Sequence, residues 1–334
     1  MNANAPPLSI IVPTYNRRER LLRLLRSLAE ESTRGAAFEV VVAIDGSTDG
    51  TAEALAGFVA PYPLIVLAGT NRGPAAARNR AVTAARGTRL LFLDDDVIAA
   101  PGLVAHHVAA AAGDECAVTI GPMLPPPGVR LAPWLRWEAE TLQKQYDAML
   151  AGVYAPTPRQ FYTGNAALAR ALFDTVGGFD ETYRRGEDVE FARRLEAAGA
   201  RFAFVPEAIV WHEPDRSFTD WLRVAYAYGT HDARAGAPLA TALEEWPERH
   251  PLNRCAARLA VGHRLRRAAI EVPLRALALA PLPGLAGARR CACSALFAIR
   301  YWQGAADTTG LGTAIWRAGV SRVTGVLAEE KGVS

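Results

Sequence analysis

The sequence predicts an α/β protein built on a mostly parallel sheet with helices on both faces. Through the first 121 residues, short apolar runs alternate with helix-forming segments, a pattern that is typical of parallel sheets. Turn-forming residues follow the apolar runs, where loops are expected. Half of the 334 residues are hydrophobic and 21% are charged, as in a globular protein with a sizeable core.

The first strand is expected at 8–12, where Pro13 stops an apolar run. The segment after it carries leucines at helical spacing, at positions 21, 22, 24, 25 and 28. A turn-forming stretch, 45–50, precedes a helix from about Thr51, and another helix is expected over 75–85. The remaining strands of this region are expected at 40–44, 64–67, 90–93 and 117–121.

The pattern changes after residue 121. Residues 122–160 are rich in proline and show no strong strand pattern. Alternation then returns, with helices expected near 168–176 and after Asp188, and strands at 202–205 and 209–211. Beyond about residue 240 the pattern is helical. We therefore predict three parts: a first half at 1–121, a second half at 122–240 and a C-terminal helical extension at 241–334.

Positive charge gathers in the C-terminal extension. The net charge is only +3, yet residues 251–334 hold twelve Lys or Arg against four Asp or Glu. Arginine alternates with apolar residues around 264–267, 274–285 and 289–290, which favours either an anionic membrane surface or an ordinary extension packed on the core. No nucleic-acid-binding motif accompanies the charge, so nucleic acid is not an expected partner.

The cysteines and the N-terminus favour a cytoplasmic protein. Cysteines at 116, 255, 291 and 293 match no zinc or CxxC spacing, so we expect reduced thiols. The N-terminus lacks the pattern of a signal peptide, and no apolar stretch has the length of a membrane span. We therefore predict a cytoplasmic location, with the cytoplasmic face of the membrane as an option.

The run Asp94-Asp95-Asp96 directly follows an apolar strand. Adjacent like charges repel, and a divalent cation such as Mg²⁺ or Mn²⁺ would resolve the conflict while binding substrate phosphates. A solvated acidic turn is the alternative. Because ligands bind at the carboxyl ends of parallel strands, residues 13–16, 45–49 and 94–96 are expected on one rim of the sheet.

Several motifs in order resemble those of family 2 glycosyltransferases, which have the GT-A fold and are inverting enzymes. The resemblance covers about residues 8–215. The motifs that carry it are Ser9–Asn16, Asp45–Thr51, Asn71-Arg72-Gly73 with Ala77-Arg78-Asn79, Asp94-Asp95-Asp96 and Gly186-Glu187-Asp188. It implies a Rossmann-like half that binds a nucleotide-diphosphate sugar and a mixed half that binds the acceptor.

The resemblance assigns the donor's base to Asp45, although an Asx-turn is an alternative use of this aspartate. Tyr15 is expected to stack on the base, above a turn shaped by Pro13 and Thr14. Arg78 is expected to contact the base or a phosphate.

Ile44 stands where family members usually carry a second acidic residue, which leaves both UDP- and dTDP-sugars as expected donors.

The same resemblance makes Asp96 the leading metal ligand. Asp94 and Asp95 are expected to contact the ion through water, or the donor's ribose and sugar hydroxyls, and Asp94 is the second candidate ligand. His212 follows a strand and is expected at the metal or the diphosphate. The ion would neutralise the leaving diphosphate.

Asp188 is expected to be the general base that deprotonates the acceptor hydroxyl, with Glu187 in support or as the second candidate. Capping the helix that follows is the alternative role of Asp188. For Trp134, Trp137 and Tyr146, both an acceptor-stacking surface and core packing are open.

The sequence thus predicts transfer of one hexosyl or deoxyhexosyl unit to a bacterial glycan, a lipid-linked or a small-molecule acceptor. It lacks the Gln-x-x-Arg-Trp element of processive members. The alternatives are a sugar-phosphate nucleotidyltransferase and a non-catalytic protein that binds nucleotide sugars or carbohydrates.

Overall fold

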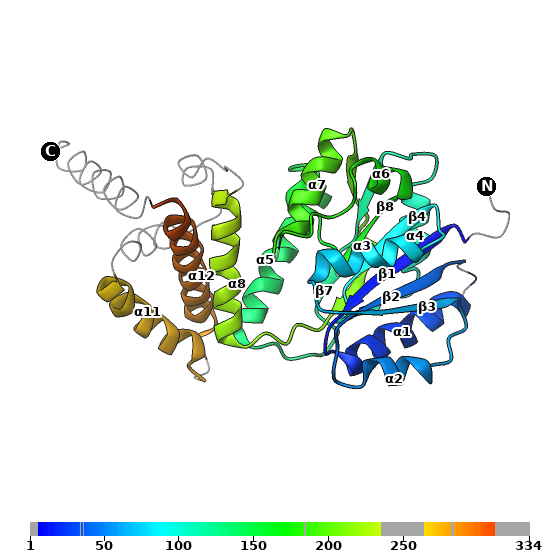
Figure 1. Cartoon of the computed structure of the whole chain (residues 1–334). Coiled ribbons are helices and arrows are strands. Elements are labelled where there is room, and N and C mark those ends of the chain that lie inside the picture. Colours follow the sequence, from blue (N-terminus) through cyan, green and yellow to red (C-terminus); the bar gives the residue numbers. More distant parts are fainter. Residues whose placement is uncertain are drawn as a thin grey trace. The chain divides into compact units, whose positions relative to one another are not determined.

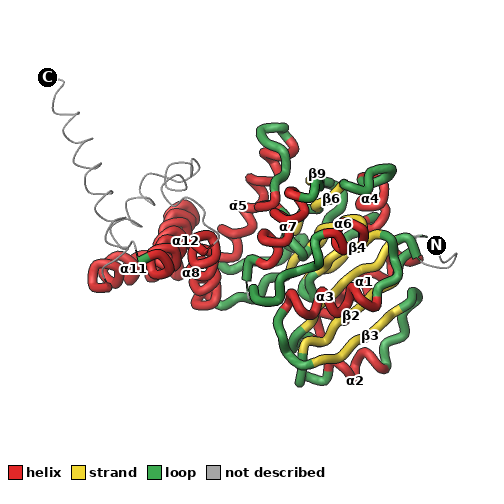
Figure 2. Tube along the Cα trace, turned by 45° about the horizontal axis from the view of Figure 1, so that its top comes forward, coloured by secondary structure: helices red, strands yellow, loops and turns green. Residues whose placement is uncertain are grey.

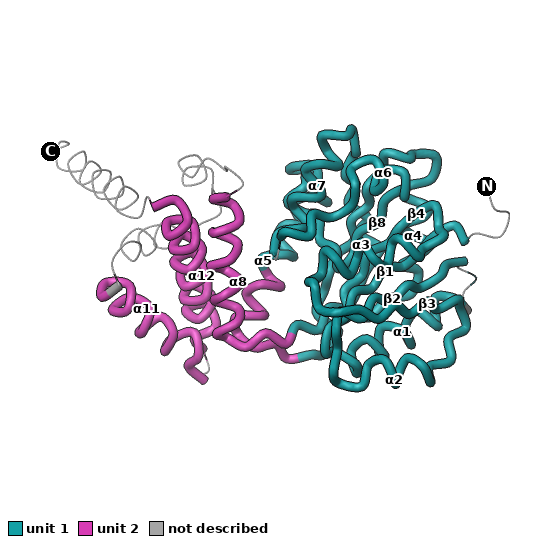
Figure 3. Tube along the Cα trace, viewed as in Figure 1, with its two compact units in different colours: residues 1–129, 141–214 teal, residues 130–140, 215–334 magenta. Residues whose placement is uncertain are grey.

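The computed structural model describes residues 6–33, 35, 37–183, 185–234, 264–281 and 284–310. These residues belong to two compact units (Figure 3). Unit 1 comprises residues 1–129 and 141–214, and unit 2 comprises 130–140 and 215–334. Both predicted halves of the chain therefore contribute to unit 1. Within the predicted extension, residues 241–263 and 311–334, with Cys255 and Pro283, lie outside the described residues, as does Arg184.

In the described part of unit 1, seven strands form one sheet in the order β3-β2-β1-β4-β8-β6-β9 (Figures 1 and 2). All neighbouring strands are parallel except that β8 runs antiparallel to β4 and β6. The bounds are β1 Leu8–Thr14, β2 Glu39–Asp45, β3 Leu64–Gly69, β4 Arg89–Leu93, β6 Ala117–Ile120, β8 Asn165–Ala169 and β9 Arg201–Phe204.

Helices cover both faces of this sheet, as predicted. The alternation of side chains along β1 divides the core into two, because Ile10 and Val12 pack with helices α1 and α2 whereas Ile11 packs with α3, α6 and α7. Burying each such side chain contributes about 1.5–3 kcal/mol. The bounds are α1 Arg18–Thr33, α2 Thr51–Ala56, α3 Pro74–Ala84, α4 Leu103–Ala110, α6 Arg170–Thr175 and α7 Glu187–Ala197.

A second, small sheet has the order β5-β10-β7 within the described residues, with bounds β5 Val97–Ala99, β7 Met123–Leu124 and β10 Val210–His212. The strand pattern at 209–211 corresponds to β10, but β5 and β7 were not predicted. Two or three residues are too few to show alternation, and these strands form only because distant segments pair with them.

Two further expectations differ from the structure. The helix expected near 168–176 begins only at Arg170, because the residues before it pair as β8 with β4 and β6. The stretch 122–160 contains the long helix α5, Pro133–Leu150, and the short 3₁₀ helix η1, Pro158–Gln160. The prolines before α5 hid this helix from pattern analysis.

Unit 2 contains the first part of α5 and the helices α8 Phe218–Arg234, α11 Arg264–Leu279 and α12 Ala286–Thr309. Glycines allow α8 and α12 to pack closely. A Cβ atom on Gly229 would lie 1.8 Å from the carbonyl oxygen of Tyr301, and one on Gly304 would lie 2.0 Å from that of Tyr226. Both helix backbones therefore come too close for any other residue at these two positions.

Two aromatic residues for which acceptor stacking and core packing were both open, Trp137 and Tyr146, pack inside the protein. Tyr146 is buried in unit 1 and stacks on Phe204, while Trp137 packs against Trp221 and Phe297 in unit 2. Core packing thus accounts for these two side chains.

Of the described residues, Cys116, Cys291 and Cys293 are free thiols, in agreement with the expectation for them. No described helix is long and apolar enough to cross a membrane.

Replacing Gly304 by alanine should lower the free energy of unfolding by about 2 kcal/mol, because the added methyl group overlaps the α8 backbone. Gly287 lies in the same helix with open space around its Cβ position, so Gly287→Ala is the matched control and should be neutral or slightly stabilising. Chemical denaturation followed by circular dichroism measures both. Equal effects of the two substitutions would contradict the close packing of α8 and α12.

Candidate active site

The carboxyl ends of β1, β2 and β4 meet at one rim of the main sheet. The parallel register places Thr14 beside Ile44, directly before Asp45, and Asp94–Asp96 follow β4 next to β1. Parallel strands end at the same edge, so residues distant in sequence become neighbours there. The predicted grouping of these segments on one rim is therefore present.

Asp95 and Asp96 share a guanidinium group that the sequence analysis did not identify. Arg17 Nη1 lies 3.0 Å from Asp95 Oδ1 and 2.6 Å from Asp96 Oδ2, and the Thr14 hydroxyl donates to Asp95 Oδ2 at 2.8 Å. Arg17 thereby relieves the repulsion between adjacent carboxylates. Arg17 also precedes α1, whose N-terminus disfavours positive charge, and this conflict was a signal in the sequence that it needs an acidic partner.

The two carboxyl groups differ in acidity. Burial raises the pKa of Asp95 to about 6, although Arg17 opposes the rise. Burial acts in the same direction on Asp96, but the imidazole of His212, together with Arg17, lowers the pKa of Asp96 to about 2. Asp96 is therefore a carboxylate at neutral pH, as a metal ligand must be.

Pairing of β10 with β5 brings His212 to Asp96. His212 stands opposite Val97 in this pairing, and the Glu213 amide donates to the Asp96 carbonyl at 3.0 Å. His212 Nε2 lies 3.6 Å from Asp96 Oδ1, and this buried oxygen has no hydrogen-bond partner in the described part of the protein. A carboxylate oxygen and an imidazole nitrogen thus lie side by side. Both are atom types that can ligate one divalent cation completed by water and phosphate.

Asp94 does not join this pair. Arg78 donates to Asp94 Oδ1 from Nη2 and to Glu187 Oε1 from Nη1, both at 2.9 Å. Accordingly, no three Asp, Glu, His or Cys side chains among the described residues gather in a way that could hold a metal ion. Of the predicted ligands, the structure groups Asp96 and His212 and places Asp94 with Arg78.

Arg78 is buried, with 4% of its surface exposed, and its guanidinium lies 5.7 Å from the ring centre of Phe179. Burial would lower its pKa, but Asp94 and Glu187 raise it above the usual value, so the group stays charged. This contact joins α3, the end of β4 and the start of α7, which are distant in sequence. It positions two of the predicted acidic residues relative to each other.

Asp188 lies beside this contact at the start of α7. Burial and the charges of Glu187 and Asp94 raise the pKa of Asp188 to about 7, against the partial opposition of Arg78. A carboxyl group with that pKa can accept a proton near neutral pH, as a general base must. The N-cap of α7 is Gly186, in the left-handed conformation, so the alternative capping role of Asp188 is wrong.

Asp45 holds the loop that leads into α3. Its two carboxylate oxygens accept the backbone amides of Arg72 at 3.0 Å and Gly73 at 2.9 Å. A Cβ atom on Gly46 would lie 2.8 Å from the amide nitrogen of Asn71, so this turn requires glycine. The Asx-turn alternative is therefore replaced by a longer-range contact.

The loop after β1 leaves Tyr15 half exposed, at 50% of its surface. Asn16, with a φ of 53°, fixes this loop by donating its amide to Ser47 Oγ and accepting the Thr48 amide. Pro13 lies within β1 opposite Ala43.

Ile44 is buried in the core on the α1 face. The unexpected residue of the sequence analysis thus serves packing.

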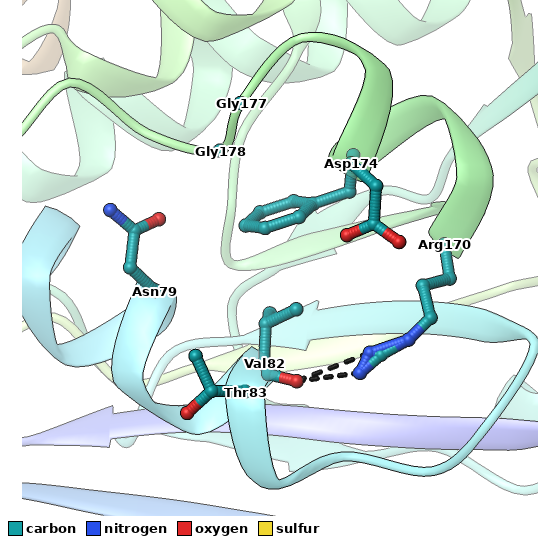
Figure 4. Close-up of a pocket in the computed structure, with 8 residues that line it drawn as sticks. Asn79, Val82, Thr83, Arg170, Asp174, Gly177 and Gly178 are labelled. Atoms are coloured by element: carbon teal, nitrogen blue, oxygen red, sulfur yellow. Dashed lines mark hydrogen bonds between the residues drawn. The ribbon is translucent and has the colours of Figure 1, made fainter.

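An open hollow of about 530 Å³ lies elsewhere in unit 1, between α3 and α6 (Figure 4). Arg170 crosses it and donates to the Val82 carbonyl, while Asn79 and Asp174 lie on its wall. None of the predicted site residues lines this hollow. The chemistry-bearing side chains are on the rim instead.

Comparison with known proteins identifies the family of the chain. Residues 9–177, just over half of the chain, match the family described as Glycosyl transferase family 2. The chain belongs to glycosyltransferase family 2. The matched segment runs from β1 through α6 and includes the Asp94–Asp96 run.

Several relatives of this family 2 chain are named as glycosyltransferases. YfnE of Bacillus subtilis, an uncharacterized glycosyltransferase, is 45% identical over 34% of this chain and 29% of its own length. Validoxylamine A glucosyltransferase of Streptomyces hygroscopicus subsp. limoneus is 33% identical over 59% of this chain and 49% of its own. The pre-mycofactocin glycosyltransferase of Mycobacterium tuberculosis is 31% identical over 73% of this chain and 48% of its own length. The chain thus spans about half or less of these curated relatives.

Among solved structures, the mannosyltransferase PcManGT of Pyrobaculum calidifontis has the same fold. Its TM-score is 0.60 at 23% identity, and the match covers 89% of this chain and 86% of that one. The family 2 chain therefore has the GT-A fold that its motifs implied.

Replacing Arg78 by methionine should lower the free energy of unfolding by about 3 kcal/mol, because Asp94 and Glu187 would lose their shared counter-charge. Arg72→Met is the control, since the pair that Arg72 forms with Glu181 is largely exposed and contributes at most about 1 kcal/mol. Equilibrium denaturation at neutral pH measures both values. A loss from Arg78→Met no larger than the control's would contradict the buried bridge.

Replacing Asp188 by asparagine should stabilise the protein in a pH-dependent way. The raised pKa means that the folded state holds a proton more tightly than the unfolded chain between 3.8 and about 7, so the wild type loses stability as the pH rises through this window. The asparagine variant avoids this loss. The difference in melting temperature between the variant and the wild type should grow as the pH rises from 4 to about 7. Above pH 7 the difference should stay constant. A constant difference from pH 4 upward would contradict the raised pKa.

Proposed function

We propose that the chain is an inverting, metal-dependent glycosyltransferase that moves one sugar from a nucleotide-diphosphate donor to an acceptor hydroxyl. One observation carries the proposal. The rim holds the ionised carboxylate of Asp96, one oxygen of which has no hydrogen-bond partner among the described residues, and the carboxyl group of Asp188, with a pKa of about 7. A carboxyl group with a lowered pKa suits a cation site, and one with a raised pKa suits a general base, so the two groups can serve one reaction.

The donor would bind along the ends of β1 and β2. The exposed ring of Tyr15 offers a stacking surface for the base, above Pro13 and Thr14. Each Asp45 oxygen accepts one backbone amide and would use its second lone pair for the base edge. We propose a UDP- or dTDP-sugar. Relatives are named for glucosyl and for L-rhamnosyl transfer, which supports hexosyl or deoxyhexosyl transfer without choosing the sugar.

Asp96 and His212 would hold Mg²⁺ or Mn²⁺ together with the diphosphate, and the ion would supply charge neutralisation for the departing nucleotide. PcManGT, which shares the fold, was solved with GDP-Man and Mn²⁺. Asp95 and Asp94 would contact the ion through water or the hydroxyl groups of the donor. Arg78 would act chiefly by orienting Asp94 and Glu187, with which it pairs.

Asp188 would accept the proton of the acceptor hydroxyl as that oxygen attacks the anomeric carbon from the side opposite the nucleotide. A single displacement of this kind inverts the configuration. Burial keeps Asp188 basic, and the negative charge of Glu187 adds to this effect because it disfavours a second carboxylate beside it. With a pKa of about 7, Asp188 is half-protonated near neutral pH.

The acceptor would be a bacterial glycan, a lipid-linked sugar or a small molecule. One relative is named N-acetylglucosaminyl-diphospho-decaprenol L-rhamnosyltransferase, and it is 30% identical over 63% of this chain and 77% of its own length. We propose that the protein acts in the cytoplasm and attaches peripherally to the membrane through its basic C-terminal extension.

Release of nucleoside diphosphate from a panel of UDP- and dTDP-sugars, with and without Mn²⁺, tests the proposal. Asp96→Asn and Asp188→Asn should each lower turnover by roughly a hundredfold or more, because each removes a group with its own task. Asp174→Asn replaces an exposed aspartate of the same unit and should leave turnover unchanged. Wild-type turnover should rise with pH up to about 7, as Asp188 loses its proton.

The two variants should differ in donor binding. Thermal stabilisation by donor and Mn²⁺ together should disappear in Asp96→Asn but persist in Asp188→Asn. Binding of a nucleotide sugar without any release by the wild type would instead indicate a non-catalytic binding protein. Formation of a nucleotide sugar from a nucleoside triphosphate and a sugar phosphate would indicate a nucleotidyltransferase.

A further inference from the structure

Helix α11 presents a continuous apolar face to solvent. Leu265, Val272 and Leu279 are 78%, 65% and 48% exposed. They are seven residues apart, so they lie on one side of the helix. Small apolar residues between them are exposed as well. Together they form what we call the α11 stripe: Leu265, Ala268, Ala269, Val272, Pro273, Ala276 and Leu279.

The opposite side of α11 is committed to packing inside unit 2. Ala278 is fully buried in one apolar cluster with α12, and Ile270 and Leu274 pack against another. Glu271 is buried on the same side and accepts a hydrogen bond from Arg300 of α12 at 2.8 Å. These contacts fix the rotation of α11, so the stripe faces outward because the other side of the helix is already used.

Positive charge borders the stripe. Arg266 is exposed on one flank, and Arg275 lies partly exposed on the other. Among the described residues, Arg267, Arg275 and Arg300 share the single carboxylate of Glu271, at 3.9, 3.0 and 2.8 Å. In sequence, α11 carries four arginines and α12 three, against one acidic residue in each. Arg290 of α12 also pairs with Glu140, at 3.5 Å. The excess positive charge beside the stripe therefore comes from α11 itself, whose sequence holds four arginines against Glu271.

We propose that the α11 stripe rests on an anionic phospholipid surface, with the helix parallel to the membrane. An apolar face bordered by arginines is the pattern of a helix lying at the membrane interface. The arginines would contact lipid phosphates, and the stripe would enter the boundary between headgroups and acyl chains. A second copy of the chain fits this face less well, because two such faces would bring like charges together. The inference rests on the proposed membrane attachment and names the surface responsible.

Flotation of the full chain with vesicles tests the proposal. The wild type should bind vesicles of phosphatidylcholine and phosphatidylglycerol, bind phosphatidylcholine alone weakly, and detach as salt is added. Replacing Leu265, Val272 and Leu279 together by glutamine should weaken binding by roughly tenfold or more, because the charge is unchanged but the apolar face is lost. Arg266→Gln should weaken it about fivefold, the contribution of one basic side chain.

The control replaces Val59, Leu150 and Val153 by glutamine. These side chains are also well exposed, at 92%, 59% and 72%, but belong to unit 1, so vesicle binding should be unchanged. Turnover with a soluble acceptor, or donor hydrolysis, should be the same in all variants. That readout distinguishes failure of the membrane surface from failure of the glycosyltransferase activity.

Other outcomes would overturn the proposal. Vesicle binding retained in full by the stripe variant would leave membrane attachment in place but assign it to another surface. No vesicle binding by the wild type at low salt would contradict both the membrane attachment and the role of the α11 stripe. A wild-type dimer that the stripe variant converts to a monomer would make the face a subunit interface. A melting temperature lowered by several degrees would show that the stripe packs within the chain.

Discussion

The buried guanidinium of Arg78 is the contact on which the candidate site depends. Negative charges that converge on one rim repel each other, and burial adds the cost of removing them from water. Arg78 compensates both effects by pairing with Asp94 and Glu187 from a position packed against Phe179. It also connects three elements that are distant in sequence, namely α3, the end of β4 and the start of α7. The position of Asp188 follows from that bridge, since Asp188 is the next residue after Glu187.

Two carboxyl groups of the rim, Asp96 and Asp188, have different neighbours and therefore different pKa values. Asp96 lies near His212 and Arg17 and remains ionised. Asp188 lies near Glu187 and Asp94, so that a proton stays bound up to about pH 7. The same principle, that neighbouring charge and burial set acidity, thus prepares one carboxylate for a cation and another for a proton. Asp95, with a pKa of about 6, lies between these extremes.

In unit 2, helix packing determines which surface of α11 stays exposed. Its helices α8 and α12 pack so closely that glycine is required at both contact points, and α11 packs against α12 through apolar residues and Glu271. With these contacts satisfied, the remaining surface of α11 is apolar and bordered by arginine. That distribution connects the basic composition of the extension with the proposed attachment to lipid, while the candidate site residues belong to unit 1.

The sequence by itself determined the fold class, the rim and most of the acidic residues on it. Apolar runs that alternate with helical segments require a mostly parallel sheet, and the topology of such a sheet gathers the residues that follow β1, β2 and β4. The motif order was sufficient for the family. Only the tertiary structure decided how the charges pair. Arg17 bridges Asp95 and Asp96, Arg78 holds Asp94 away from the pair formed by Asp96 and His212, and Asp45 anchors a loop. These outcomes depend on contacts between segments tens to hundreds of residues apart, and on burial, neither of which local spacing encodes.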